Sequence, residues 1–220
     1  MNKLEIKNLS HSYVDGMKKK KVLNDLSLEF ESGKFYAILG ESGSGKTTFL
    51  SLIAGLLNAQ EGEILFNGED IKKNGLNNYR LTKMSIIFQN YNLIPYMTGV
   101  ENIETLMNIR KEKSKSRKEK IYSLLKEVGI DKETANRNVQ KLSGGEQQRV
   151  AIARSLSCDI PIILADEPTG NLDEENEEKI IEIFNKLKKD KIVIVVTHSS
   201  KIAKRADVVY ELKKGKLIKK

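Results

Sequence analysis

The chain has 220 residues, is 39% apolar and carries a formal net charge of +8, which suffices for one hydrophobic core with an appended subdomain. Its longest apolar runs, at 160–165 and 192–196, fall well short of the roughly 18 residues of a membrane span, and 1–5 lacks the apolar core of a secretory signal. The single cysteine, Cys158, excludes an internal disulfide and a cysteine-cluster metal site, so a cytoplasmic protein is expected. The positive net charge is compatible with binding to nucleic acid, with binding to an anionic membrane face, or with a role in solubility alone, and by itself it does not distinguish these three interpretations.

The first third of the chain has the patterns of strands around one buried helix. A helix is expected at Thr47–Leu57, where apolar residues lie on nearly every side, as in a helix beneath a sheet. Strands are expected at Leu4–Leu9, Val22–Phe30, Phe35–Leu39, Ile64–Phe66 and Met84–Phe88.

The middle third is polar and helical in pattern. Helices are expected at Val100–Arg110 and Lys118–Val128, the second closed by Gly129, and a longer helix is expected from Ser143 to about Ser157. We interpret this stretch, about 90–157, as an insertion into an α/β core formed by 1–89 and 158–220, within a single domain.

The last third alternates strand and helix. Buried-type strands at Ile162–Asp166 and Ile192–Thr197 flank an amphipathic helix at Glu174–Lys188, and Val208–Ile218 has the pattern of a hairpin folded at Gly215. Because strands separated by helices require crossover connections, the pattern favours a parallel sheet.

A glycine-rich loop follows the strand Phe35–Leu39. The run Gly40-Glu41-Ser42-Gly43-Ser44-Gly45-Lys46-Thr47 fits G-x-x-x-x-G-K-[ST] between a strand and a helix, which is the context that a phosphate-binding loop requires. Its glycines let backbone N–H groups converge on phosphate oxygens, Lys46 reaches the β and γ phosphates, and Thr47 offers a hydroxyl to Mg²⁺. A plain glycine turn rarely supplies Lys-Thr at this spacing, so ATP with Mg²⁺ is the expected ligand.

An acidic pair ends the strand Ile162–Asp166. Asp166 is expected to hold Mg²⁺, directly or through water, and Glu167 is expected to polarise the attacking water as a general base. A solvated acidic pair at a strand end is the alternative, but it would leave the phosphate loop without a partner. Binding with hydrolysis is therefore favoured over binding alone.

A second helix opens at Leu142-Ser143-Gly144-Gly145-Glu146-Gln147-Gln148-Arg149. Its N-terminus is suited to an anion, although an N-cap with a flexible lead-in explains Ser143–Gly145 equally well when that run is taken alone. The chain thus has one nucleotide-binding loop but two helix N-termini suited to a phosphate. A head-to-tail arrangement of two copies would explain the second one. Each copy would then lend Ser143–Gly145 to the γ-phosphate bound by the other.

In this order the motifs resemble those of ABC-type ATPase subunits, and the resemblance covers nearly the whole chain. Leu-Ser-Gly-Gly-Glu-Gln-Gln-Arg, placed after the phosphate loop and just before 165–169 (Ala-Asp-Glu-Pro-Thr), is highly specific. The resemblance implies a P-loop NTPase core with a mostly parallel sheet, an N-terminal antiparallel β-subdomain and an inserted α-helical subdomain. It also implies ATP and Mg²⁺ as cofactors and a head-to-tail dimer.

The resemblance also implies roles for single residues. Tyr13 resembles the aromatic residue that stacks on adenine, Gln89 the glutamine that contacts Mg²⁺ and the attacking water, and His198 the histidine that grips the γ-phosphate. Apart from the family order, a strand-end tyrosine, an unrelated loop glutamine and a structural histidine explain these residues as well. Asp173 belongs to a run, Asn171–Asp173, that resembles the loop crossing between partners, or it caps the helix that begins at Glu174.

Three sets of site residues are thus expected. The catalytic set is Glu167, His198 and Gln89, and the Mg²⁺ ligands are Thr47, Gln89 and Asp166. The nucleotide-binding set is Tyr13, Gly40, Glu41, Ser42, Gly43, Ser44, Gly45, Lys46, Thr47, Thr48, Ser143, Gly144, Gly145, Glu146 and Asp173.

Three positions depart from the commonest family pattern without removing a catalytic group. Glu41 stands where many relatives have proline, Ser199 where aspartate is common, and Glu146 where glutamine is commonest. Glu-Gln-Gln-Arg and the short chain resemble the branch of MacB, LolD and FtsE. This branch implies an ATPase that powers export or mechanotransmission of a lipoprotein, peptide or antibiotic at the cytoplasmic face of the plasma membrane. Its partners would be a second copy and an integral membrane permease, with no nucleic acid.

The segment after Gln89 and the two basic stretches each allow two interpretations. The run Asn90–Asn102 resembles the lining of the groove where a membrane subunit docks a short helix, although its apolar residues Leu93, Ile94, Tyr96 and Met97 also suit ordinary core. The basic stretches Lys18–Lys21, expected at a hairpin, and Arg110–Lys120 suit solvated surface or an anionic membrane leaflet.

Two other functions compete. A soluble phosphate-loop switch or kinase is the remote alternative, because Asn185-Lys186-Leu187-Lys188 resembles the guanine-selecting Asn-Lys-x-Asp but lacks the aspartate and lies within an amphipathic helix. An ABC ATPase that regulates a membrane complex in cell division, rather than transport, is the nearer alternative.

Overall fold

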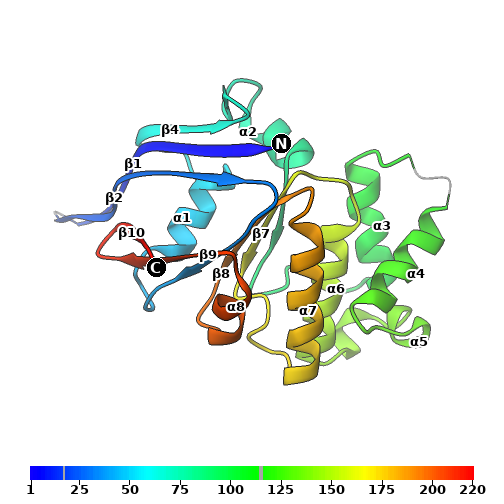
Figure 1. Ribbon diagram of the computed structural model, residues 1–220. Helices are drawn as coiled ribbons and strands as arrows, with labels where there is room; N and C mark the ends of the chain where they lie inside the picture. Colours follow the sequence, from blue (N-terminus) through cyan, green and yellow to red (C-terminus); the bar gives the residue numbers. More distant parts are fainter. Residues whose placement is uncertain (17, 114–115) are drawn as a thin grey trace.

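The computed structural model describes residues 1–16, 18–113 and 116–220, and the side chains of Asp15, Lys18 and Lys19 lie outside that description. The chain forms two sheets and a group of helices (Figure 1). The strands are β1 (Lys3–Asp15), β2 (Lys18–Glu31), β3 (Phe35–Leu39), β4 (Glu61–Phe66), β5 (Glu69–Asp70), β6 (Met84–Ile87), β7 (Ile162–Asp166), β8 (Ile192–Val196), β9 (Val208–Lys213) and β10 (Lys216–Lys219). The helices are α1 (Lys46–Ile53), α2 (Leu76–Thr82), α3 (Gly99–Ile109), α4 (Arg117–Glu127), α5 (Lys132–Ala135), the 3₁₀ turn η1 (Val139–Lys141), α6 (Gly144–Leu156), α7 (Glu174–Leu187) and α8 (Ser200–Arg205).

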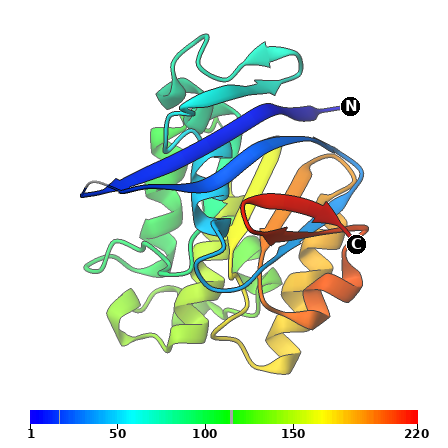
Figure 2. The ribbon, with the colours of Figure 1, turned by 90° about the vertical axis from the view of Figure 1, so that its left-hand side faces the viewer.

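The larger sheet has the strand order β10-β9-β3-β8-β7-β6. Neighbouring strands from β9 to β6 are parallel, and only the terminal hairpin adds an antiparallel edge. The smaller sheet, β2-β1-β4-β5, is antiparallel and lies over one face of the larger one (Figure 2). The predicted α/β fold with a mostly parallel sheet and an N-terminal antiparallel sheet is confirmed.

Alternation along the central strands explains the two hydrophobic layers. On β3, Phe35 and Ala37 face one cluster while Tyr36 and Ile38 face the other. Successive side chains of a strand point to opposite faces, so a strand that is apolar throughout is covered on both. One layer is formed with α6, α7 and α8, and the other with α1 and the antiparallel sheet.

Helix α1 lies between the two sheets, which explains why its apolar residues are not confined to one side. Phe49, Leu50, Leu52 and Ile53 are all almost completely buried. The helix ends at Ile53 rather than at Leu57 as expected. The reason is Gly55, whose φ of +64° is a left-handed conformation that stops a helix.

Helices α3 to α6 pack together beside the edge strand β6. Their ends follow local rules, since α3 begins with a capping box of Thr98 and Glu101 and α4 is closed by Gly129 at a φ of +77°. The boundaries of a helical subdomain near 90 and 157 stay a prediction. Within the described ranges, no helix is long and apolar enough to span a bilayer.

Several short elements were not expected from the sequence. These are α2, β5, α5, η1 and α8, and each is too short to show a clear period. The stretch Lys18–Lys21 forms the start of β2 and pairs with the end of β1, so it lies at the hairpin between the first two strands, as expected. Of the basic segment Arg110–Lys120, Lys115 lies outside the described residues.

Candidate functional site

The ends of four parallel strands meet at one edge of the larger sheet. The phosphate loop follows β3, His198 follows β8, Glu167 follows β7, and Gln89 follows β6. Carboxyl ends of parallel strands share an edge, which is where open α/β sheets bind ligands. A cavity of about 550 Å³ opens there, lined by Tyr13, Val22, Ser42, Gly43, Gly45, Lys46, Thr47, Thr48, Gln89, Asp166, Glu167, Gly170 and His198. This volume lies within the range of small-molecule pockets.

The phosphate loop depends on glycine at Gly45, which precedes α1. Its φ is +104°, and an added Cβ would lie 2.7 Å from Cγ1 of Val22. No side chain caps the N-terminus of α1. The first N–H groups of this helix are therefore available to a phosphate.

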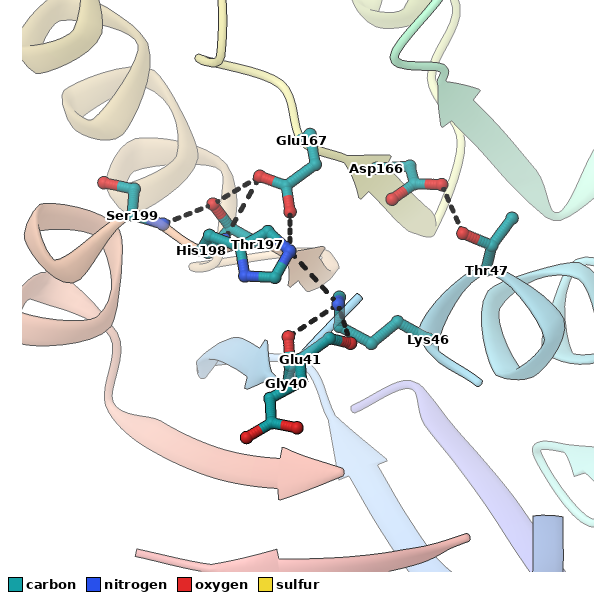
Figure 3. A network of polar contacts seen from close by, with 9 residues as sticks. All are labelled: Gly40, Glu41, Lys46, Thr47, Asp166, Glu167, Thr197, His198 and Ser199. Atoms are coloured by element: carbon teal, nitrogen blue, oxygen red, sulfur yellow. Dashed lines mark hydrogen bonds and ion pairs between the residues drawn. The ribbon is translucent and has the colours of Figure 1, made fainter. Parts of the chain in front are cut away.

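Lys46 lies inside the loop with 8% of its surface exposed. Its Nζ atom donates to the carbonyl oxygens of Gly40 at 2.6 Å and Glu41 at 3.0 Å, and it lies 3.3 Å from Nε2 of His198 (Figure 3). Burial lowers the pKa of Lys46, although the carboxylates of Glu167 and Asp166 act in the opposite direction. A bound anionic phosphate would place a negative charge beside this buried ammonium group and so stabilise its protonated form.

Thr47 and Asp166 join the loop to the end of β7. The hydroxyl of Thr47 donates to Oδ2 of Asp166 at 3.2 Å. Burial raises the pKa of Asp166 above its ordinary value, and the neighbouring carboxylate of Glu167 adds to the rise. A hydroxyl beside a carboxylate fits Mg²⁺, which takes oxygen ligands from one or two protein groups together with substrate phosphates.

Glu167 is held in an uncommon backbone conformation, with a φ of +47°. Its Oε2 atom accepts from the Thr197 hydroxyl and from the His198 N–H, both at 3.1 Å. The other carboxylate oxygen, Oε1, is buried without a hydrogen-bond partner and lies 3.5 Å from Nε2 of His198. A non-glycine residue at positive φ is costly, and an unpaired buried oxygen in a ligand-sized cavity indicates a group that acts on a ligand.

Tyr13 lies at the side of the cavity, 45% exposed. Its hydroxyl is 3.3 Å from Oγ1 of Thr48, and the His11 ring packs edge-on against its ring with centroids 5.0 Å apart. The tyrosine ring therefore packs against His11 and is partly exposed at the cavity, an arrangement that suits stacking on a flat base.

Some expected residues do not line this cavity. Glu41 and Ser44 line an adjoining hollow, which shares Ser42 and Gly43 with the cavity. Asp173 caps α7 by accepting from the N–H of Asn176. Ser143, Gly144, Gly145 and Glu146 are also absent from the cavity lining. Side chains of the same helix end cap its N-terminus, because Ser143 and Glu146 form a reciprocal capping box.

The structure adds residues that no motif indicated. Val22 packs so close to Gly45 that it leaves no room there for a side chain. Thr197 donates a hydrogen bond to the carboxylate of Glu167, and Gly170 lines the cavity. Thr197 directly precedes His198, but its role depends on the contact between β8 and β7, which a linear pattern does not reveal.

Comparison with known proteins gives one consistent result. Residues 23–170 match the model of the ABC transporter family. The uncharacterized ABC transporter ATP-binding protein YclH of Bacillus subtilis is 45% identical over 98% of this chain and 95% of its own length. The lipoprotein-releasing system ATP-binding protein LolD of Francisella tularensis is 39% identical over 97% of this chain and 95% of its own length.

Among solved structures, the dimeric post-hydrolysis state of the ATP-binding cassette MJ0796 of Methanocaldococcus jannaschii, bound to ADP and Pi, superimposes with a TM-score of 0.92. It is 35% identical, and the match covers 99% of this chain and 97% of that one. The chain therefore belongs to the ABC transporter ATP-binding family, and it is an ATP-binding ATPase of a transporter-type system.

Proposed function

We propose that this chain works as a head-to-tail dimer that hydrolyses two ATP molecules to drive a separate membrane subunit in export or mechanotransmission. The cargo class that we propose is a lipoprotein, peptide or antibiotic, by analogy with the resembling branch. The observation that carries the proposal is the environment of Glu167. One of its oxygens accepts hydrogen bonds from Thr197 and His198, and the other has no hydrogen-bond partner and lies 3.5 Å from Nε2 of His198, beside the phosphate loop.

The residues divide the chemistry among them. Lys46 and the N-terminus of α1 hold the phosphates, and Thr47, Asp166 and Gln89 would hold Mg²⁺, which supplies charge neutralisation on the phosphate oxygens when bound. Glu167 accepts a proton from the attacking water through Oε1. His198, 56% exposed at its side chain and within 3.5 Å of both Glu167 and Lys46, orients the γ-phosphate.

A second copy completes the site in this proposal. The cavity lacks Ser143–Gly145, whose helix N-terminus would cover the γ-phosphate of the opposite subunit. The dimeric state named for the MJ0796 cassette supports this arrangement. The loop Asn171–Asp173 would then lie at the crossing between the two subunits.

A groove beside α3 is our proposed contact with the membrane subunit. It encloses about 310 Å³, and its apolar lining includes Phe88, Ile94, Leu106 and Ile109. Three arginines and no acidic side chain lie in that lining, so an apolar helix with an acidic flank would complement it. The occupant that we propose is a short helix of the permease, at the inner face of the membrane.

The segment Asn90–Asn102 supplies part of this groove and part of the core. Leu93 packs against the hydrophobic cluster, whereas Ile94 lines the groove. Tyr96 is 75% exposed, which is unusual for a tyrosine that serves only packing. We therefore assign Leu93 to the core and propose Ile94 and Tyr96 for docking.

Glu167→Gln tests the catalytic assignment. The amide keeps the shape of the side chain but cannot accept the proton, so we expect ATP turnover to fall by at least about 10²-fold. ATP binding should persist, and gel filtration with ATP should show a trapped dimer. Glu174→Gln is the matched control, because Glu174 is a glutamate with a 91% exposed side chain. A steady-state rate unchanged by Glu167→Gln would contradict the proposal.

Ile94→Asp tests the docking groove. The isolated chain should keep its ATPase activity, while co-purification of a membrane subunit from detergent extracts should be lost because a buried carboxylate is costly. Ile218→Asp, at a 52% exposed isoleucine of β10, is the control. Equal recovery of the membrane subunit with both variants would remove the groove from the proposal.

A further inference from the structure

The turn after Gln89 has an uncommon backbone conformation that a side chain of another element holds in place. Tyr91 and Asn92 both have left-handed backbones, with φ of +59° and +49°. Tyrosine rarely adopts this conformation, whereas asparagine adopts it more readily, so the strain lies mainly at Tyr91 and persists because the surroundings hold it. Arg154 of α6 holds both residues, since Nη2 donates to the carbonyl of Tyr91 at 2.8 Å and Nη1 to that of Asn92 at 2.5 Å.

This turn aims the Tyr91 hydroxyl at two other segments. The side-chain amide of Asn171 donates to it at 2.7 Å. A Cβ added to Gly144, at the N-terminus of α6, would lie only 3.1 Å from the same oxygen. A Cβ added to Gly145 would lie 3.2 Å from the carbonyl of Asn171. Three segments therefore meet around one hydroxyl group.

Each segment leads to a part of the proposed ATP site. Asn171 follows Glu167 through two tight turns, in which Gly170 donates to the carbonyl of Glu167 at 3.3 Å and Leu172 to that of Thr169 at 3.1 Å. The tyrosine itself lies two residues beyond Gln89, within the segment Asn90–Asn102 that supplies part of the groove. A shift of the groove segment would thus reach both the loop after Glu167 and the N-terminus of α6.

From this juxtaposition we infer that Tyr91 is a positioning residue. Its hydroxyl keeps the loop after Glu167 aligned with the turn after Gln89, and so holds Glu167 in place for hydrolysis. This inference rests on the proposed function, because its measured consequence is ATP turnover. No contact between Tyr91 and the nucleotide is required.

The test is a cycle of Tyr91→Phe, Asn171→Ala and the double variant, assayed as full-length protein at concentrations that saturate the rate. Tyr91→Phe keeps the ring and removes only the hydroxyl, so we expect kcat to fall about three- to tenfold, the effect of one hydrogen bond, with KM unchanged. Asn171→Ala should act similarly, and the double variant should be no slower than the slower single variant, because both remove one interaction.

Tyr122→Phe is the matched control. It removes a tyrosine–asparagine hydrogen bond of 3.1 Å to Asn136, remote from the cavity lining. Its kcat should equal that of the parent, and the melting temperatures of Tyr91→Phe and Tyr122→Phe should be similar. A normal kcat in Tyr91→Phe, or losses that multiply in the double variant, would overturn the inference. Glu167→Gln in the same assay keeps the two proposals separate, because its continued turnover would instead overturn the proposed function.

Discussion

Two helix N-termini in this chain carry glycine-rich sequences, but they are built in opposite ways. The N-terminus of α1 follows Gly45, a left-handed residue, and has no side-chain cap. The N-terminus of α6 follows Ser143 and has a complete capping box with Glu146. The first leaves its N–H groups for a ligand, whereas the second already places a carboxylate near its positive end.

The difference indicates how binding and closure are divided. A monomer has at α1 an uncapped helix end and a buried cation, Lys46, so it should bind ATP unaided. At α6 the capping box of Ser143 and Glu146 stabilises the helix end without a ligand, so in the proposed dimer this end can be formed before it meets the phosphate bound by the other subunit. Changes at α1 should therefore weaken ATP binding by the monomer, whereas changes at α6 should leave ATP binding intact and slow hydrolysis in the proposed dimer.

The largest effect is expected for Lys46→Ala. Removing the buried ammonium group that we propose to contact the phosphates should weaken ATP binding on the order of 10²-fold or more. Fluorescence titration with a labelled ATP analogue measures this affinity on the monomer. Ser143→Ala should bind the analogue normally in the same titration. An equal loss of affinity in both variants would contradict the idea that only the N-terminus of α1 binds ATP in the monomer.

Gly45→Ala should come next, through stability. Alanine at a φ of +104° is strained, and its Cβ would meet Val22, so we expect a loss of about 2 kcal/mol or more in the free energy of unfolding. Gly43→Ala separates the two causes, because Gly43 has a φ of +76° but no atom within 4 Å of an added Cβ. Urea unfolding should show the smaller loss at Gly43, and equal losses would exclude the clash with Val22.

Ser143→Ala should cost about 1 kcal/mol of unfolding free energy, the usual contribution of an N-cap. Thr98→Ala is a matched control, because Thr98 forms the same capping box at α3. The two variants should lose similar stability in urea, but only Ser143→Ala should slow hydrolysis at protein concentrations where the rate has saturated. Equal ATPase rates would mean that Ser143 serves only as a cap.

Glu146→Gln should have the smallest effect. Glutamine can also return a hydrogen bond to the N-cap N–H, so the capping box persists and the free energy of unfolding should change by no more than about 0.5 kcal/mol. ATPase activity should stay within about twofold. A loss larger than that of Ser143→Ala would show that the carboxylate itself acts in the closed site.

Most regular elements could be predicted from the sequence because their causes are local. The strand Ile162–Asp166 and the start of α7 at Glu174 are as expected, and the Val208–Ile218 hairpin lies within one residue of the observed strands. The end of α1 was predicted four residues too late, because apolar residues continue past Gly55 and pack outside the helix. Elements as short as α8, with six residues, show too little period to be recognised.

The sequence by itself determined the chemistry that depends on spacing along the chain. The phosphate loop, the pair Asp166–Glu167 and the cap at Ser143 are runs of adjacent residues, and adjacency is what a sequence records. Only the tertiary structure decided which of these runs share a cavity, and that Thr197 anchors Glu167 while Tyr91 joins the loop of Asn171 to α6. Those contacts depend on the order of strands in the sheet and on left-handed turns, which bring together residues far apart in the chain.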